Sequence, residues 1–486
     1  MKYVPTLSIL GAYTTLASNP LTPGPYTASN PGGIADPHMH VFPESDKPDR
    51  VYVYATHDEI HANDGQGGCC TGEWWIWGSD DLVHWEEEAT LPPLPWEDAD
   101  SYSRNWATDC VYRDGYYYWY VSIGAKTIGV VKSDTPVGPW ESPLDLPMVN
   151  TTLVGIPDGA TDTRDPGTFV DPLDNQFYLV YGACSQPDDE QPLTGCYWVS
   201  LLSDDMISTK EVFKLDILDA MGPYGSGKAD DKPYLHFNDG LYYLSWGCFY
   251  ATSDNVRGPY QYQGSIIDAE LLDPEFRVGN LTQEPWYTQD DYQDRHGSFL
   301  NFKNQWYFFS NDRSHSTVPF DEMFRNAVGS YVHYNDNGTI APIQIDATGV
   351  GMYDGQKAIQ AENYFFMEGG EKREHVYGRE FHVRTSTEGG PVSLYYPKIN
   401  ISGGEASAIK LFVENLGADG GSVIVTKGSC DSDDADVIAK CTLERTDTDG
   451  GFEEQSFQLG ENVAGDVDLC LRMTGSAIKL DKFEIV

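Results

Sequence analysis

The sequence predicts an all-β protein: a five-bladed β-propeller followed by a β-sandwich of the jelly-roll type. Three observations support this prediction. Short segments rich in Tyr, Trp and Val recur along the chain, 48 Gly and 29 Pro supply frequent turns, and helical periodicity is nearly absent. Residues 211–221 are the one short candidate for a helix.

The recurring segment has a nearly constant period. Successive markers are separated by 65, 61, 65 and 64 residues. The markers are Tyr52, Tyr117, Tyr178, Tyr243 and Tyr307. Turn-forming pairs such as Asp114-Gly115 and Asp239-Gly240 precede most markers, as in β-hairpins, and a Ser-Asp turn follows the first four. One such unit would form one blade, so five copies predict five blades; the alternative is a β-sandwich with coincidental spacing.

The composition changes near residue 350. All 12 Trp residues lie between Trp74 and Trp306, and alternating strands with Gly-rich turns follow the connector. We therefore expect the propeller over residues 21–345, a linker over residues 346–357 and the β-sandwich over residues 358–486.

The N-terminus favours export. Residues 1–20 have the features of a secretory signal peptide cleaved near Ala17 or Ser18; an ordinary N-terminal strand or tail is the alternative. Four Asn-X-Ser/Thr sequons and nine cysteines also favour a secreted, extracellular protein. Cys430 and Cys441 are close enough in sequence to close a small disulfide loop.

The chain is strongly acidic, with 31 Lys plus Arg against 75 Asp plus Glu and a formal net charge of −44. Such a charge repels phosphate backbones and anionic lipids, so we expect neither a nucleic-acid partner nor a membrane partner. We expect a monomer.

Three carboxylates precede different markers at comparable distances. Asp36, Asp165 and Asp231 each lie some 11 to 16 residues before a marker tyrosine. Because propellers bind ligands where their innermost strands converge, equivalent positions in three blades would bring these carboxylates together near the axis.

Several motifs together resemble glycoside hydrolase family 43 across residues 25–345. They are 35–38 (ADPH) with 54–58 (YATHD), 79–85 (SDDLVHW), 165–171 (DPGTFVD) and 295–299 (RHGSF). The resemblance implies a five-bladed propeller and hydrolysis with inversion. It assigns Asp36 as the general base and Asp165 as the carboxylate that tunes and orients the acid.

The sequence departs from the family pattern at the general acid, where Asp231 stands in place of Glu. Three interpretations remain open. Asp231 serves as the acid after a small backbone shift, Asp230 serves after a register slip, or the acid is missing and the propeller binds sugar without efficient hydrolysis.

The same resemblance implies further site residues. Trp106 would stack on a sugar, and Asp109, His57 and Arg295 would contact substrate. His296 would point at a calcium or its water, with a packed core histidine as the alternative. His38 and His40 form a His-X-His pair on one strand face, which suits zinc, but histidines without a zinc site are the favoured interpretation because no third ligand with motif support is evident.

The C-terminal segments 359–364 (IQAENY) and 480–485 (LDKFEI) resemble carbohydrate-binding module family 6. The resemblance implies a structural calcium held by Glu362 and Asp481, since that ion prefers oxygen ligands. This part of the chain has no Trp, which leaves Tyr377, Tyr395 and Tyr396 as sugar platforms.

From these resemblances we expect an inverting glycosidase that removes arabinofuranosyl or xylosyl residues from plant-type polysaccharide or oligosaccharide. Hydrolysis of galactosyl or galactofuranosyl residues, and a catalytically weakened carbohydrate-binding propeller, are the alternatives. Transfer to phosphate would need a cationic cluster, for which Arg164 and Lys232 alone argue weakly. No organic cofactor is expected, and calcium is the expected metal.

Overall fold

The computed structural model describes residues 15–16, 19, 21, 32–59, 72–95, 105–124, 127–153, 155, 163–182, 197–218, 221–222, 225–226, 232–272, 295–312, 325–345, 348–375, 380–386, 390–417, 420–431, 436–446 and 451–486. Within these ranges every regular element is a β-strand, and none is a helix that could cross a membrane. The all-β prediction is confirmed.

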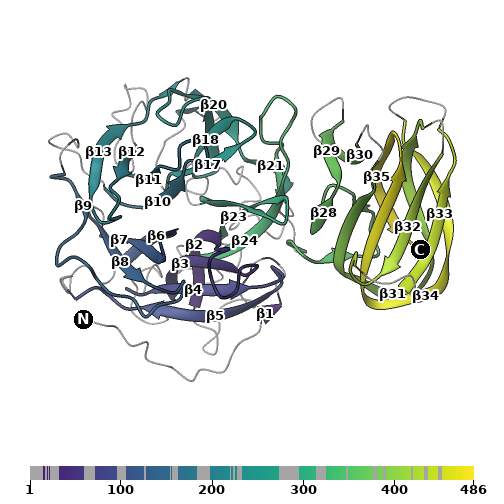
Figure 1. Cartoon of the computed structure of the whole chain (residues 1–486), viewed down its shortest axis with the longest axis horizontal. Helices are drawn as coiled ribbons and strands as arrows, with labels where there is room; N and C mark the ends of the chain where they lie inside the picture. The colour runs from purple at the N-terminus through teal and green to yellow at the C-terminus, as the bar shows by residue number, and fades with distance from the viewer. Residues whose placement is uncertain are drawn as a thin grey trace. The chain divides into compact units, whose positions relative to one another are not determined.

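The predicted five-bladed propeller is also confirmed (Figure 1). The first blade contains β2 (Gly32–Val41), β3 (Val51–Glu59), β4 (Trp74–Ser79) and β5 (His84–Leu91). The second contains β6 (Asn105–Arg113), β7 (Tyr116–Ile123), β8 (Thr127–Ser133) and β9 (Val149–Asn150). The third contains β10 (Gly167–Val170), β11 (Phe177–Tyr181), β12 (Trp198–Leu202) and β13 (Thr209–Lys214).

The last two blades follow the same order. The fourth contains β17 (Tyr234–Asn238), β18 (Leu241–Trp246), β19 (Phe249–Ser253) and β20 (Tyr260–Ser265), with β14 (Ile217–Leu218) on β20. The fifth contains β22 (Gly297–Phe302), β23 (Gln305–Asp312) and β24 (Asn326–Val332). Two short pairs complete this part: β15 (Met221–Gly222) with β16 (Gly225–Ser226), and β21 (Ile267–Leu272) with β25 (Ile343–Ile345). The helix expected over residues 211–221 is therefore wrong, because this stretch contributes to β13, β14 and β15.

The repeat is an inner-blade hairpin with a buried tyrosine. Strands β6 and β7 are joined through Asp114 and Gly115, at φ angles of 51° and 89°, and β17 and β18 through Asp239 and Gly240, at 46° and 86°. Positive φ at both turn residues matches the twist of antiparallel strands. All five marker tyrosines are buried. The period therefore reflects one core position used once per blade.

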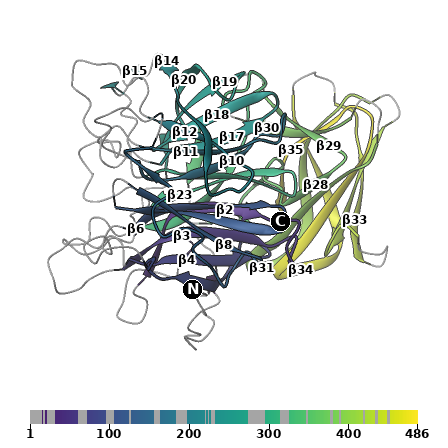
Figure 2. The same ribbon diagram turned by 60° about the vertical axis from the view of Figure 1, so that its left-hand side comes forward.

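The seam between the first and fifth blades is bridged by residues near the N-terminus. Strand β1 (Thr15–Leu16) pairs with β5. Asn19 exchanges two hydrogen bonds with Gly329 of β24, and the Leu21 amide donates to the Ala327 carbonyl at 2.8 Å. Figure 2 shows β2, β3 and β4 of the first blade side by side.

A second compact unit contains residues 301–307, 331–343 and 348–486. Its ten strands form one curled sheet, consistent with the expected β-sandwich. They are β26 (Tyr353–Asp354), β27 (Ile359–Gln360), β28 (Phe366–Glu368), β29 (Gly370–Glu374), β30 (Phe381–Thr385), β31 (Val392–Asn415), β32 (Gly421–Lys427), β33 (Val437–Leu443), β34 (Glu453–Gly475) and β35 (Ile478–Ile485).

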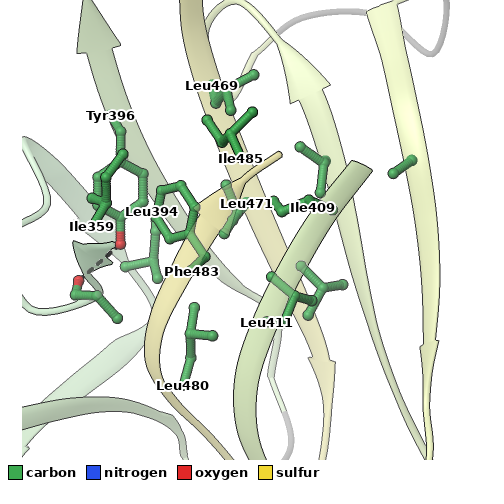
Figure 3. Close-up of a cluster of buried hydrophobic side chains, with 14 of the residues drawn as sticks. Ile359, Leu394, Tyr396, Ile409, Leu411, Leu469, Leu471, Leu480, Phe483 and Ile485 are labelled. Atoms are coloured by element: carbon green, nitrogen blue, oxygen red, sulfur yellow. Dashed lines mark hydrogen bonds between the residues drawn. The ribbon is translucent and has the colours of Figure 1, made fainter. Parts of the chain in front are cut away.

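The core of this unit lies inside the curl, where β31, β34 and β35 pack together (Figure 3). Leu394, Leu411 and Phe483 are among the fully buried side chains. The buried Tyr396 hydroxyl is satisfied by donating to the Ala361 carbonyl at 2.8 Å. Cys430 pairs with Cys470 rather than with Cys441, which is a buried free thiol, so the expected small loop is wrong.

Candidate active site

Asp36 lies in a β-bulge of the innermost strand of the first blade. Ala35 pairs with Thr56 and His38 with Tyr54, so residues 36 and 37 have no direct partners on β3. Asp36 has a φ of 50°, in the left-handed region that Asp tolerates better than most residues. The bulge turns the Asp36 carboxylate away from the regular pleat, toward side chains of β3 and the fifth blade.

The Asp36 carboxylate is buried and heavily hydrogen-bonded. Its Oδ1 accepts from His296 Nε2 at 2.5 Å, Asn311 Nδ2 at 3.1 Å and Arg325 Nη1 at 2.9 Å. Its Oδ2 accepts from the Thr56 hydroxyl at 2.5 Å. Asn311 also accepts from the Asp36 amide through Oδ1 at 2.7 Å. The carboxylate is therefore fixed in orientation before any ligand arrives.

Arg325 is shared between two buried carboxylates. Besides Asp36, its guanidinium contacts Asp58 through Nε at 2.9 Å and Nη2 at 3.1 Å, and its amide donates to Asp58 Oδ2 at 3.1 Å. A planar guanidinium suits such multiple contacts better than an ammonium. Asp58 therefore orients the cation that faces Asp36.

The electrostatics of Asp36 favour its ionised form. Burial alone would raise its pKa, but the Arg325 charge, the His296 hydrogen bond and the Lys232 charge together hold the pKa of Asp36 well below its usual range. The group is therefore a carboxylate at neutral pH.

Asp165 occupies an equivalent turn ahead of β10 in the third blade. It precedes Pro166, has a φ of 56° and is buried. Its amide donates to Ser122 Oγ at 3.2 Å, and Arg164 Nε lies 3.5 Å from its Oδ2. The structure thus brings Asp36 and Asp165 to matching positions in their blades. Asp230 and Asp231 lie outside the described residues.

Lys232, the first described residue after Asp231, has its side chain buried in the same region. Its ammonium donates to the Asp36 carbonyl at 2.8 Å and approaches the Thr108 carbonyl at 3.4 Å. Burial lowers the pKa of Lys232 to about 8, against the opposing charges of Asp36, Asp109 and Asp165.

Asp109 is a hydrogen-bond hub between blades. Its Oδ2 accepts from the Thr168 amide and hydroxyl at 2.5 and 2.8 Å and lies 2.8 Å from His38 Nδ1. Its Oδ1 accepts from the Cys110 amide at 2.8 Å and lies 2.5 Å from His40 Nε2. With both oxygens filled by protein donors, the geometry gives no support to the expected contact with sugar hydroxyls, which stays a prediction.

His38, His40 and Asp109 also place one ligand atom each within 4.8 Å of the others, close enough for a metal. Asp109 is the third group that the sequence did not reveal. Because its oxygens already accept five protein contacts, we interpret the trio as a hydrogen-bonded hub. Burial lowers the pKa of His38 to about 4, so this ring is neutral at pH 7.

Two half-buried tryptophans flank this region. Trp75 stacks on His57 with ring centroids 3.4 Å apart, and the Arg164 guanidinium lies 5.1 Å from the centre of the Trp106 ring. Burial lowers the pKa of His57 to about 3, so this ring presents a neutral face. The expected sugar contacts of Trp106 and His57 stay predictions.

Arg295 and His296 have protein partners. Arg295 is buried with its Nη1 3.2 Å from Asp312 Oδ2, and His296 uses Nε2 for Asp36. The geometry favours neither the expected substrate contact of Arg295 nor a metal role for the Nε2 of His296, and both stay predictions.

Sequence reasoning missed the groups that surround Asp36. Thr56 and Asp58 stood inside a recognised motif without an assigned role, whereas Asn311 and Arg325 carried no local signal. Their importance comes from the closure of the ring, which brings residues some 290 positions apart into contact.

In the second unit, Glu362 and Asp481 lie on neighbouring segments, since the Ala361 amide donates to the Asp481 carbonyl at 2.8 Å. Glu362 Oε2 is buried with no hydrogen-bond partner among the described residues. Burial raises the pKa of Glu362 to about 8. A buried carboxylate oxygen of this kind is a suitable ligand for a hard cation, whereas Asp481 Oδ1 already lies 3.0 Å from His375 Nε2, so calcium at these two residues stays a prediction.

Known proteins resemble this chain in sequence and fold. An arabinoxylan arabinofuranohydrolase of Paenibacillus polymyxa is 25% identical over 375 residues, which cover 72% of this chain but only 56% of that relative. A xylosidase/arabinosidase of Bacteroides ovatus is 27% identical over 363 residues, covering 67% of this chain and 97% of the relative.

The fold has a solved counterpart. The crystal structure of a glycoside hydrolase family 43 arabinoxylan arabinofuranohydrolase from Bacillus subtilis, in complex with cellotetraose, superposes with a TM-score of 0.53. It covers 97% of this chain and 99% of that one at 20% identity, which supports the fold. The family model described as Glycosyl hydrolases family 43 matches residues 36–340, and the chain therefore belongs to that family.

Proposed function

We propose that the chain is a glycosidase that removes arabinofuranosyl or xylosyl residues from polysaccharide or oligosaccharide with inversion. One observation carries the proposal: Asp36 is a buried carboxylate, kept ionised and fixed by Arg325, His296, Asn311 and Thr56. The names of the two relatives support the choice of sugars.

Asp36 would act as the general base. Its Oδ1 is filled by three donors, whereas Oδ2 accepts only from Thr56 among the described residues and keeps a lone pair for water. The carboxylate takes a proton from that water as the water attacks the anomeric carbon. A preorganised ionised base needs no rearrangement at that moment.

A carboxylic acid must protonate the departing oxygen, about 6.5–9.5 Å from the base in inverting enzymes. We assign this role to Asp231, on its position in the sequence. Asp165 would tune the acid, because a nearby carboxylate raises the pKa of another and keeps it protonated.

The test is sugar release from nitrophenyl arabinofuranoside, xyloside, galactopyranoside and galactofuranoside, and from arabinoxylan and arabinan. Asp36→Asn keeps the size of the side chain. Asp204→Asn is the matched control, because it makes the same exchange at an exposed carboxylate that has no assigned role in the site. We expect Asp36→Asn to lose about 10²–10⁴-fold in kcat and Asp204→Asn to lose nothing.

Release unaffected by Asp36→Asn would remove Asp36 from the mechanism. Binding of oligosaccharide without release by the wild type would instead favour a carbohydrate-binding propeller that lacks a working acid. Proton NMR of the first product formed would separate inversion from retention.

We further propose that the second unit is a carbohydrate-binding module whose fold is completed by calcium at Glu362 and Asp481. The ion would neutralise Glu362 and tie its segment to β35. Secretion is proposed on the Cys430–Cys470 disulfide, which persists in oxidising compartments.

A further inference from the structure

The propeller uses the same unusual turn three times. Asp36-Pro37 lies in the bulge of the innermost strand of its blade, whereas Asp165-Pro166 and Lys232-Pro233 directly precede the innermost strands of theirs. The residues before the three prolines have φ angles of 50°, 56° and 47°. The position in the fourth blade that matches the two carboxylates is therefore held by Lys232.

Lysine is costly at this position in two ways. Left-handed φ is uncommon for residues other than Gly, Asn and Asp, and it persists where the surroundings enforce it. The side chain is also completely buried, so its ammonium has lost its hydration. Neither cost is needed for the turn itself, which Gly would form more easily.

The contacts of the ammonium explain what offsets these costs. From the fourth blade it reaches the Asp36 carbonyl of the first blade at 2.8 Å and the Thr108 carbonyl of the second at 3.4 Å. The negative charges of Asp36, Asp109 and Asp165 act favourably on the ammonium. One side chain thereby joins three blades beneath the carboxylate that we assign as the base.

We propose that Lys232 is a positioning residue for Asp36, which it holds in the left-handed bulge through the Asp36 carbonyl while its charge stabilises the ionised carboxylate. This inference rests on the proposed function. Arg325 acts on the carboxylate oxygens, and Lys232 acts on the backbone of the same residue. The two cations therefore fix opposite ends of Asp36.

Three substitutions separate the backbone from the charge. Lys232→Met keeps most of the volume without the charge, Lys232→Arg keeps the charge, and Lys232→Gly removes the side chain while relieving the left-handed backbone. Lys210→Met, at an exposed lysine paired with Asp204, is the matched control. Each variant is measured for thermal stability, and its kcat, KM and pH dependence of kcat/KM are measured on the nitrophenyl glycoside that the wild type hydrolyses.

We expect Lys232→Met and Lys232→Gly to lower kcat about 10²-fold, as for a misplaced catalytic group, with KM changed less than about threefold. Lys232→Arg should recover most of the kcat, and Lys210→Met should match the wild type. The acidic limb of kcat/KM should move to higher pH in Lys232→Met, since loss of a cation raises the pKa of Asp36. His38, Asp109, Asp165 and Arg325 also face this ammonium and remain unchanged in each variant.

Wild-type kcat and an unmoved acidic limb in Lys232→Met or Lys232→Gly would overturn the inference. If Lys232→Met does not fold, the kcat values of Lys232→Gly and Lys232→Arg test the inference. A lysine with a purely structural role predicts the same kcat in every variant that folds. A wild type without sugar release would overturn the proposed function and this inference together, whereas an active wild type with unaffected variants would overturn this inference alone.

Discussion

The Arg325 guanidinium lies 2.9 Å from the Oδ1 of Asp36, so the fifth blade supplies the positive charge that keeps the first blade's carboxylate ionised. The two residues are 289 positions apart and meet only when the ring is closed. The orientation of the Asp36 carboxylate therefore depends on closure of the propeller, and substitutions at this pair should affect activity and stability together.

Arg325→Met should lower both kcat and the free energy of unfolding. It leaves Asp36 and Asp58 buried without their shared cation, which costs about 3–5 kcal/mol for a broken buried pair. Asp36 has a lowered pKa in the folded protein, so its contribution to stability is present above its unfolded pKa and is lost as pH falls through the folded pKa. The deficit of Arg325→Met, measured by urea unfolding, should therefore be fully present at pH 7 and should shrink as the pH falls below about 4, the pKa of an unfolded Asp.

Arg257→Met is the matched control for that measurement, because Arg257 forms an exposed ion pair with Glu211. Exposed pairs contribute little to stability. Equal losses in the two variants, or a deficit in Arg325→Met that does not depend on pH, would contradict the role assigned to Arg325.

Trp106→Ala should raise KM about tenfold while changing kcat less. The indole is half-buried and the Arg164 guanidinium faces its ring, so a sugar would stack on the remaining exposed aromatic surface. Initial rates on the preferred arabinoside or xyloside give both constants, and Trp106→Phe should keep KM within about threefold. A Trp106→Ala variant with an unchanged KM would make Trp106 a packing residue only.

Calcium should stabilise the second unit through Glu362. The pKa of Glu362 is raised to about 8, so without metal its burial costs more stability as pH rises from about 4.5 to 8. Calcium at a concentration a hundredfold above its Kd would add about 2.7 kcal/mol to the free energy of unfolding. This stabilisation should be larger at pH 8 than at pH 5, because protons compete with calcium for the carboxylates.

Calorimetry with and without a chelator tests this effect. In calcium-free buffer at pH 8, Glu362→Gln should be more stable than the wild type and should not respond to calcium. Glu405→Gln, at an exposed carboxylate, should respond as the wild type does. A calcium response retained in Glu362→Gln would place the ion elsewhere.

Reduction of the Cys430–Cys470 disulfide should destabilise the second unit by about 3–4 kcal/mol, since it closes a loop of 40 residues. A Cys430→Ser/Cys470→Ser variant should reproduce the effect and lose its sensitivity to reductant. The double variant should still release sugar at temperatures at which its second unit remains folded. Cys441→Ser should leave the sensitivity to reductant intact, and loss of that sensitivity would mean that Cys441 takes part in the pairing.

The fold could be predicted from the sequence because the blades of a propeller repeat one sequence pattern. Five buried tyrosines and their hairpin turns recur with the blade, and each turn pair such as Asp114-Gly115 has local chemistry that can be read directly. The helix over residues 211–221 was predicted wrongly because β13 is an outer strand with mixed exposure. The spacing of its polar residues resembles that on the exposed face of a helix.

The candidate site was harder to predict because its partners come from distant blades. Asp36 and Asp165 stood in recognisable motifs, but Asn311 and Arg325 become neighbours only through the closed ring. Lys232 was noted only as a flanking cation, because neither its left-handed φ nor its burial is visible in a linear sequence. Cys470 was likewise remote from Cys430 in sequence; it lies on β34 opposite Thr426, and the turn after β32 brings Cys430 to it.

The three matching turns before Pro37, Pro166 and Pro233 have a consequence for how such a site can diversify. The backbone offers the same left-handed position in three blades, and the residue that fills it decides whether a blade contributes a carboxylate or a cation. Exchanges at these three positions would redistribute charge around the axis, and at Asp36 and Lys232 they would also remove contacts that join the blades.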